Sequence, residues 1–571
     1  MIQRPASGSM AQFGNYTTEG MCGFPRRGKD EWGESAILWG AMERHDRPAP
    51  PDYGIMFNHD GTFHGKSEYP QRTDELLDKL YGPLQNTQVG AFMWCVGAEQ
   101  ARWPSDELES IFDPRDRRYG SVKEFRRAES VRAMFDRGED LYGDIVRRGH
   151  DLGMDVYVAI RMNDNHFWSD SARKAFPLAP EEMAKTVRPE LTQFRKDHPE
   201  WVLGIGNAPR WAVTSWNMAI PEVREYVLLR IREACLLADW DGVEIDWQRH
   251  AFHLPGQDAY RLRYALTDLQ RGIRQVADEI ARERGRPFYI LARVGASEET
   301  NRRIGYDVGT WIDEGLTDIL ATNSNSGNDP GVEVERYVEM MEGTNIKLYP
   351  GFDSHGEFGR GHLVEQSRWR EAWVRGLAKS YYDRGASGVH VFNWHNYAAQ
   401  LNGLLTTIGS SDTLTGVDTI YTPVKRHVRN RAEIRYGAER DDRLLGEIPV
   451  PLYRTLTGDG PTFHIAVHDD VSEGTSVELQ VNLDHYSPND AVSVTLDGEL
   501  LGEPVLHRTS GEGHLSEDAW LVWTLDPAQV GRGVHDVRIV LDCRDPRIGV
   551  PIVIENVELH ITYSQEGESS P

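Results

Sequence analysis

Short apolar runs alternate with longer segments of helical periodicity from about residue 53 to about residue 400. This alternation predicts parallel strands joined by crossover helices. The segment 221–240, for example, begins at Pro221, which suits a first helical turn, and repeats apolar residues along one face. The predicted strands are the runs 53–58, 89–97, 154–160, 242–247, 287–294, 316–323, 345–352 and 388–394.

The number of these runs favours a closed (β/α)8 TIM barrel over an open, doubly wound sheet. After about residue 420 the pattern changes to short segments of alternating apolar and polar residues between Gly, Asp, Asn and Pro turns. Such alternation is typical of a β-sandwich. We therefore expect an α/β protein with an N-terminal extension at 1–50, a barrel at 51–415, an all-β sandwich at 420–563 and a flexible tail at 564–571.

The composition is that of a folded protein with a strong negative charge. Apolar residues make up 39% of the 571 residues, and the formal net charge is -26 at pH 7. Phosphate binding requires clustered basic residues, so we expect no nucleic-acid partner.

No apolar stretch is long enough to span a membrane, and the first residues lack the apolar core of a signal peptide. We expect no membrane partner and a cytoplasmic location for the chain as given, or a secreted or periplasmic one if a leader has been removed. The cysteines lack CxxC spacing, which favours buried, reduced thiols. They are Cys22, Cys95, Cys235 and Cys543.

Polar side chains follow several of the predicted strands. In a (β/α)8 barrel the active site lies at the carboxyl ends of the strands. The run 53–58 is followed by Asp60, and the runs 316–323 and 388–394 contain Asn323 and Asn393 near their ends. Barrel ends also carry polar residues that only cap strands, but convergence from several strands favours a functional site.

The segment DGVEIDWQ at 241–248 looks like the DGxDxDxE motif of chitinase-type glycosidases. That motif ends in the glutamate that protonates the leaving group, and Gln248 cannot donate a catalytic proton. Glu244 and Asp246 alternate with apolar residues, so we expect both to point into the barrel. There they would support the site by pairing with Arg161 or Arg249.

A metal-dependent barrel hydrolase is a second alternative, because several histidines lie near predicted strand ends. Barrel amidohydrolases begin with an HxH pair and add histidines from the fifth and sixth strands. Here those strands end in Arg293 and Asn323. We therefore expect no metal and no cofactor.

Two potential proton carriers remain, Asp60 and His166, beside Arg161 and Arg249. A guanidinium group forms a planar fork that matches a carboxylate with two hydrogen bonds. Two arginines at a barrel mouth therefore favour an acidic substrate. The alternative is that neighbouring carboxylates of the same protein, such as Asp164, neutralise them.

This set of residues resembles the inverting exo-sialidases of glycoside hydrolase family 156, which are (β/α)8 barrels with a β-rich C-terminal domain. The motifs that match are RMNDNH at 161–166, EIDWQRH at 244–250 and VFNW at 391–394. The resemblance implies release of terminal α-linked N-acetyl- or N-glycolylneuraminic acid. It also implies that the residues holding the substrate carboxylate are Arg161, Arg249 and Asn393, and that the catalytic pair is Asp60 and His166.

Sialosides carry a carboxylate on the anomeric carbon, which would repel an anionic nucleophile. We therefore expect direct attack by water with inversion. The sequence leaves open which of Asp60 and His166 is the acid and which the base; our hypothesis, from their positions on different strands, makes Asp60 the general base and His166 the general acid. Asn163 and Asn323 are also expected to contact the substrate. The alternatives are hydrolysis of another acidic or neutral glycan on the same barrel, and carbohydrate binding without catalysis.

The expected partners are a sialylated glycan or free sialic acid. A second copy of the chain is a further candidate partner, since added sandwich domains often supply dimer surfaces. Linkage preference and the role of the sandwich stay open at this point.

Overall fold

The computed structural model describes residues 47–61, 69–97, 99–113, 119, 122–163, 192–208, 212–322, 330–353, 366–396, 398–424, 447–471, 475–508 and 519–563. All of these residues belong to one compact unit, Arg44–Pro571.

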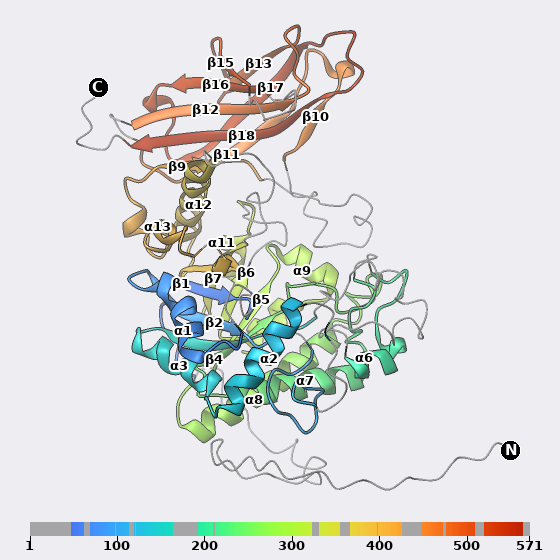
Figure 1. Cartoon of the computed structure of the whole chain (residues 1–571). Coiled ribbons are helices and arrows are strands. Elements are labelled where there is room, and N and C mark those ends of the chain that lie inside the picture. Colours follow the sequence, from blue (N-terminus) through green and yellow to red (C-terminus); the bar gives the residue numbers. More distant parts are fainter. Residues whose placement is uncertain are drawn as a thin grey trace, which may run out of the picture. The chain divides into compact units, whose positions relative to one another are not determined.

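Eight parallel strands close into a barrel in the order in which they follow one another along the chain (Figure 1). Each predicted run overlaps one of them, with bounds that differ by a few residues, which confirms the predicted barrel. The strands are β1 (Ile55–His59), β2 (Val89–Cys95), β3 (Asp155–Arg161), β4 (Gly242–Asp246), β5 (Tyr289–Val294), β6 (Ile319–Thr322), β7 (Lys347–Asp353) and β8 (Val389–Phe392).

Helices lie between successive strands. The predicted helix at 221–240 forms α7 (Pro221–Cys235), which begins at Pro221 and buries its apolar face against the barrel. The other α-helices of the described residues are α1 (Thr73–Tyr81), α2 (Val122–Asp136), α3 (Leu141–Asp151), α6 (Gln193–Asp197), α8 (Tyr264–Arg284), α9 (Glu298–Ile304), α10 (Val308–Asp313), α11 (Val334–Met340), α12 (Gln366–Asp383) and α13 (Asn402–Leu405).

The alternation of side chains along the strands creates two cores. Ile245 and Trp247 belong to the large core between strands and helices. Tyr157, Leu291 and Tyr349 belong to a separate cluster that fills the barrel lumen. Glu244 and Asp246 alternate with Val243 and Ile245 along β4 and therefore point into the lumen, as the sequence pattern predicts.

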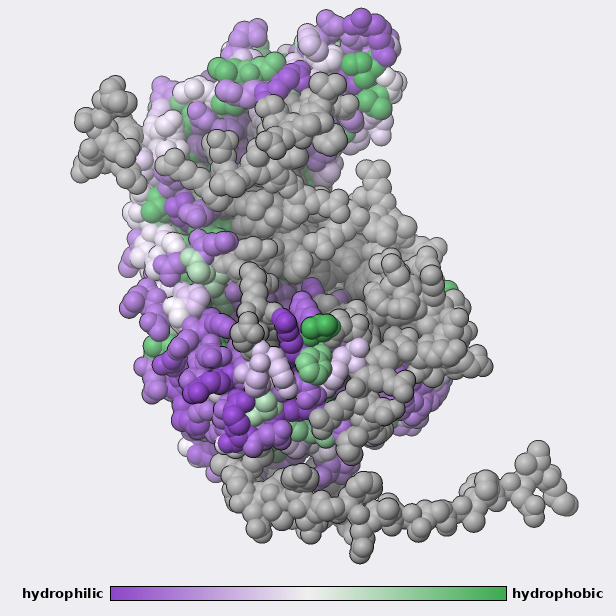
Figure 2. Space-filling view, in the orientation of Figure 1, coloured by the Kyte–Doolittle hydropathy of each residue, from purple (hydrophilic) through white to green (hydrophobic). Residues whose placement is uncertain are grey.

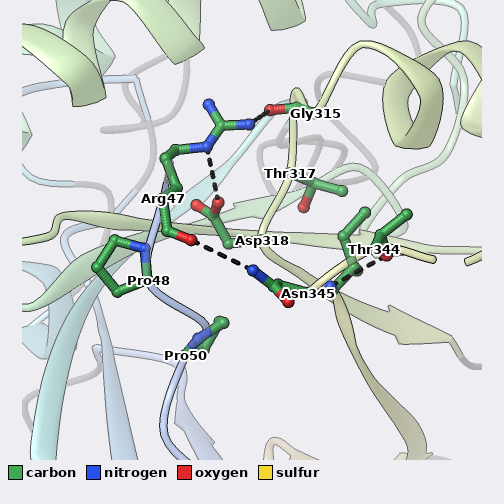
Figure 3. A pocket seen from close by; sticks show the side chains of 9 residues that line it. Arg47, Pro48, Pro50, Gly315, Thr317, Asp318, Thr344 and Asn345 are labelled. Carbon is green, nitrogen blue, oxygen red and sulfur yellow. Dashed lines mark hydrogen bonds and ion pairs between the residues drawn. The ribbon is translucent and has the colours of Figure 1, made fainter. Parts of the chain in front are cut away.

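Contacts between Arg47 and the segments before β6 and β7 lie at the amino-terminal end of the barrel. Arg47 donates to the carbonyl oxygen of Gly315 at 2.5 Å and lies 3.8 Å from the Asp318 carboxylate (Figure 3). Asn345 donates to the carbonyl oxygen of Arg47 at 3.3 Å. These residues line a small pocket just before β6 and β7, so this pocket lies opposite the end where barrel active sites occur.

The C-terminal residues form two antiparallel sheets, and side chains from both share one hydrophobic core. This arrangement agrees with the predicted sandwich. One sheet contains β9 (Thr419–Tyr421), β10 (Val450–Leu452), β12 (Thr475–Asp484), β15 (Val505–His507), β16 (Ala519–Leu525) and β18 (Ile552–Tyr563), and the other contains β11 (Thr462–Val467), β13 (Ala491–Leu496), β14 (Glu499–Leu500) and β17 (Gly533–Cys543).

A buried carboxylate connects these sheets to the barrel. Asp469 has no exposed side-chain surface and pairs with Lys379 on α12. The same carboxylate accepts hydrogen bonds from the hydroxyls of Thr419, Tyr421 and Tyr563 at 2.5, 2.8 and 2.9 Å. These donors compensate the cost of burying the charge, so the junction is a specific contact between α12 and the strands beside it.

The cysteine prediction is wrong at one position. Cys95 and Cys235 are buried free thiols, as expected, whereas Cys543 is exposed. Cys543 is the last residue of β17 and pairs with Ala491 beyond an irregularity in the strand register. Cys22 lies outside the described residues.

The described surface on the face shown in Figure 2 is mainly hydrophilic, with small and scattered hydrophobic groups. Among the described residues, no helix is both long enough and apolar enough to cross a membrane.

Candidate functional site

The carboxyl ends of β1 and β3 bring Asp60 and Arg161 together. Asp60 directly follows β1, and Arg161 is the last residue of β3. The Arg161 Nη2 atom lies 3.8 Å from the Asp60 Oδ2 atom, and the side chains are 8% and 22% exposed. Arg230 on α7 donates to the carbonyl oxygen of Arg161 at 2.6 Å and fixes the end of β3. The ion pair thus has a largely buried guanidinium and a partly exposed carboxylate.

A glycine fixes the turn after Asp60. Gly61 has a φ of +67°, and a Cβ atom there would lie 1.6 Å from the carbonyl oxygen of Cys95. Any larger residue would push the chain away from β2. The Gly61 N–H also donates to His59 Nδ1 at 3.0 Å. This tight turn sets the direction in which Asp60 leaves β1.

The end of β4 is organised by the buried carboxylate of Asp246. Its Oδ1 atom accepts hydrogen bonds from the backbone N–H groups of Gln248 at 3.1 Å and Arg249 at 2.9 Å. The same oxygen accepts a hydrogen bond from Arg293 Nη1 at 2.8 Å. The expected pairing of Asp246 with the side chain of Arg161 or Arg249 is therefore corrected. Its ionic partner is Arg293, which lies opposite it on β5.

Glu244 lies deeper in the lumen and is fully buried. It accepts a hydrogen bond from Asn58 Nδ2 at 2.5 Å, and its Oε1 atom lies 3.2 Å from His390 Nε2. Asn58 is on β1 and His390 on β8, so these contacts cross the barrel from β4. Glu244 points inward as expected, but its partners are an amide and an imidazole rather than the expected arginines.

Two described non-glycine residues beyond the carboxyl ends of barrel strands have left-handed backbone conformations. They are His250, with φ +55°, and Asn393, with φ +60°. Backbone strain of this kind costs about 1–3 kcal/mol and clusters at functional sites. The Asn393 N–H donates to the carbonyl oxygen of Asn58 at 3.3 Å, which ties the end of β8 to β1.

Buried oxygen atoms at these strand ends receive no hydrogen bond from any described residue. They include Oδ1 of Asn393, Oε1 of Gln248 and Oδ2 of Asp246. A buried acceptor that lacks a donor is costly unless a ligand or water satisfies it. Gln248 was not among the site residues predicted from the sequence, because its amide cannot donate the proton that the chitinase-type motif requires.

Asn163 does not fit its expected role as a substrate contact. Its Nδ2 atom donates to the carbonyl oxygen of Phe252 and to His253 Nδ1, both at 2.9 Å, and its Oδ1 atom accepts from the Trp216 N–H at 2.9 Å. The amide is thus satisfied within the protein. It ties the loop after β3 to the loop after β4, and we remove it from the candidate substrate-binding residues.

His253 completes this connection. Its Nε2 atom lies 2.9 Å from the carbonyl oxygen of Trp247 and must donate, so Nδ1 is the acceptor for Asn163. Both contacts are those of the neutral ring. Burial lowers the pKa of His253 to about 4. The neutral imidazole therefore holds the loop that carries Arg249.

Two of the residues predicted to form the site, His166 and Asn323, lie outside the described residues. Asp60, Arg161, Arg249 and Asn393 all follow or end barrel strands at the carboxyl end, as expected. In the part of the chain that the structure describes, no three His, Cys, Asp or Glu side chains are grouped as metal ligands would be.

No model of a known protein family matches the sequence, and no curated protein matches it. Among solved structures, a family 36 α-galactosidase from Geobacillus stearothermophilus is 11% identical, with a TM-score of 0.31, over 86% of this chain and 56% of that one. The chain therefore spans little more than half the length of that enzyme.

Two shorter structures are also similar to this chain. The glycoside hydrolase domain of PgaB from Bordetella bronchiseptica is 11% identical, with a TM-score of 0.35, over 62% of this chain and 99% of that one. A class V chitinase from Nicotiana tobaccum is 12% identical, with a TM-score of 0.32, over 63% of this chain and 98% of that one.

The neutral state of His253 predicts a loss of stability in mild acid. The pKa of about 4 in the folded protein lies below the ordinary 6.5, so between these pH values the unfolded chain binds a proton that the folded protein excludes. This histidine's contribution is full above pH 6.5 and falls by about 3 kcal/mol as the pH approaches 4. We expect urea unfolding to show a steeper loss from pH 7.5 to pH 5 for the wild type than for His253→Gln. Equal losses would contradict the assignment.

Proposed function

We propose that this protein is a glycoside hydrolase that releases terminal α-linked sialic acid, N-acetyl- or N-glycolylneuraminic acid, from a sialylated glycan. The reaction proceeds with inversion and without a metal. The observation that supports the proposal most is the contact of Asp60 with Arg161, 3.8 Å apart at the carboxyl end of the barrel. An accessible carboxylate beside a cation provides a base and an anion-binding group in one place.

The acidic group of the substrate would be held by Arg161, Arg249 and Asn393. Guanidinium groups bind a carboxylate through paired, charge-assisted hydrogen bonds. The Arg249 backbone is anchored to Asp246, and the end of β3 is anchored by Arg230. Such anchoring matters because a preorganised site loses little conformational freedom when the ligand binds.

The reaction would divide two proton transfers between opposite faces of the sugar. The Asp60 carboxylate, which lies 3.8 Å from the Arg161 guanidinium, would accept a proton from water. That water attacks the anomeric carbon as His166 donates a proton to the leaving oxygen. The bond to the leaving group breaks, and the carbon inverts. Proton exchange with solvent then restores the carboxylate and the imidazolium.

The substrate and the stereochemistry can be tested in one experiment. We expect the protein to hydrolyse 4-methylumbelliferyl α-N-acetylneuraminide, with the β anomer as the first product in a proton NMR time course. EDTA should leave the rate unchanged. First release of the α anomer would contradict inversion, and a lack of both hydrolysis and acid-sugar binding would contradict the proposed substrate class.

The role of Asp60 can be tested with a matched carboxylate. We expect Asp60→Asn to lower kcat about 10²–10⁴-fold, because the amide cannot accept the proton of water. Asp52→Asn is the control, since Asp52 is exposed and pairs with Lys347 at 2.7 Å before β1. Its kcat should equal that of the wild type. Full activity in Asp60→Asn would remove this residue from the mechanism.

A further inference from the structure

We propose that Arg293 is a positioning residue of the candidate site, which holds the loop after β4 and the end of β8 in their working geometry. This inference rests on the proposed function, because the elements that it holds carry Arg249 and Asn393. Arg293 does not belong to the set of residues predicted from the sequence. It lies on β5 and has no exposed side-chain surface.

One contact of Arg293 leads to Arg249. Its Nη1 atom donates to Asp246 Oδ1 at 2.8 Å, and this same oxygen holds the backbone N–H groups of Gln248 and Arg249. A charged carboxylate that is 1% exposed is costly unless a partner compensates its charge. Loss of the guanidinium would leave Asp246 buried without that partner, so the loop would shift to bring the carboxylate into contact with water. Such a shift weakens the anchor of the Arg249 backbone.

A second contact leads to Asn393. The guanidinium carbon of Arg293 lies 3.6 Å from the centroid of the Phe392 ring, which is the geometry of a close cation–π contact. Phe392 ends β8, and the next residue has the left-handed backbone conformation. Arg293 therefore connects the ends of β4 and β8 through side chains that are themselves buried.

Arg293 also affects the charge that a substrate meets. It balances the negative charge of Asp246, which otherwise would oppose an anionic group arriving at the barrel mouth. Sequence reasoning assigned this balancing role to Arg161 or Arg249. Because Arg293 is the ionic partner of Asp246, this carboxylate does not compete with the substrate for the guanidinium groups of Arg161 and Arg249.

The test compares Arg293→Met and Arg293→Lys with a control at a second buried arginine. Met retains bulk beside Phe392 without charge, and Lys retains the charge without the planar fork. The control is Arg274→Met, because Arg274 is also buried and donates to Asp318 at 2.5 Å, on the helical side of the barrel before β6. It reports the general effect of removing a buried ion pair.

Hydrogen exchange measured by mass spectrometry provides a readout that needs no substrate. In Arg293→Met we expect peptides that contain the amides of Gln248 and Arg249 to exchange at least about tenfold faster than in the wild type. Arg274→Met should leave these peptides unchanged. Arg293→Lys should give a smaller effect of the same sign, and it replaces the methionine variant if that variant does not fold.

Kinetics on 4-methylumbelliferyl α-N-acetylneuraminide supply the second readout. We expect Arg293→Met to raise KM about tenfold or more, Arg293→Lys to recover part of the loss, and Arg274→Met to retain the wild-type KM. Unchanged exchange of these peptides in both Arg293 variants would overturn the inference, as would faster exchange with an unchanged KM. If the wild type itself has no activity, the proposed function fails, while unchanged or faster exchange still decides whether Arg293 holds the loop.

Discussion

The arrangement of the candidate site depends on the compensation of charges buried in the barrel lumen. Glu244, Asp246 and Arg293 all point into this lumen and have almost no contact with solvent. An uncompensated charge in such a place is very costly, so each must have a fixed partner. Arg293 on β5 meets this requirement for Asp246 on β4, and Glu244 contacts Asn58 on β1 and His390 on β8.

This compensation determines what lies above it at the carboxyl end. Asp246 anchors the loop that carries Arg249, and Asn58 holds both Glu244 and the backbone of Asn393. Outside the lumen, the neutral ring of His253 and the amide of Asn163 join the loops after β3 and β4. The residues proposed to meet the substrate are thus held in place by buried side chains on neighbouring strands and loops, which is how a rigid site is built.

Much of the barrel could be predicted from the sequence, because a buried parallel strand requires a nearly continuous apolar run. Each of the eight runs overlaps a strand, and the ends of the runs indicated Asp60, Arg161 and Asn393 as site residues. Partners distant in sequence could not be predicted. The amide of Asn163 is satisfied by residues 53 to 90 positions away.

The choice among several possible partners was also beyond sequence reasoning. Asp246 lies opposite both Arg161 and Arg293 in the strand register, and only the folded lumen determines that it pairs with Arg293. The exposure of Cys543 follows in the same way from a register irregularity that the alternating pattern of β17 does not reveal.

Recognition of a carboxylate by arginines at the barrel mouth is the central claim, and calorimetry can test it directly. The comparison is the affinity of the wild-type protein for N-acetylneuraminic acid and for its methyl ester, which has the same sugar without the charge. Charge-assisted hydrogen bonds to two guanidinium groups predict that the acid binds about 100-fold more tightly. Equal affinity for the acid and the ester would contradict the account.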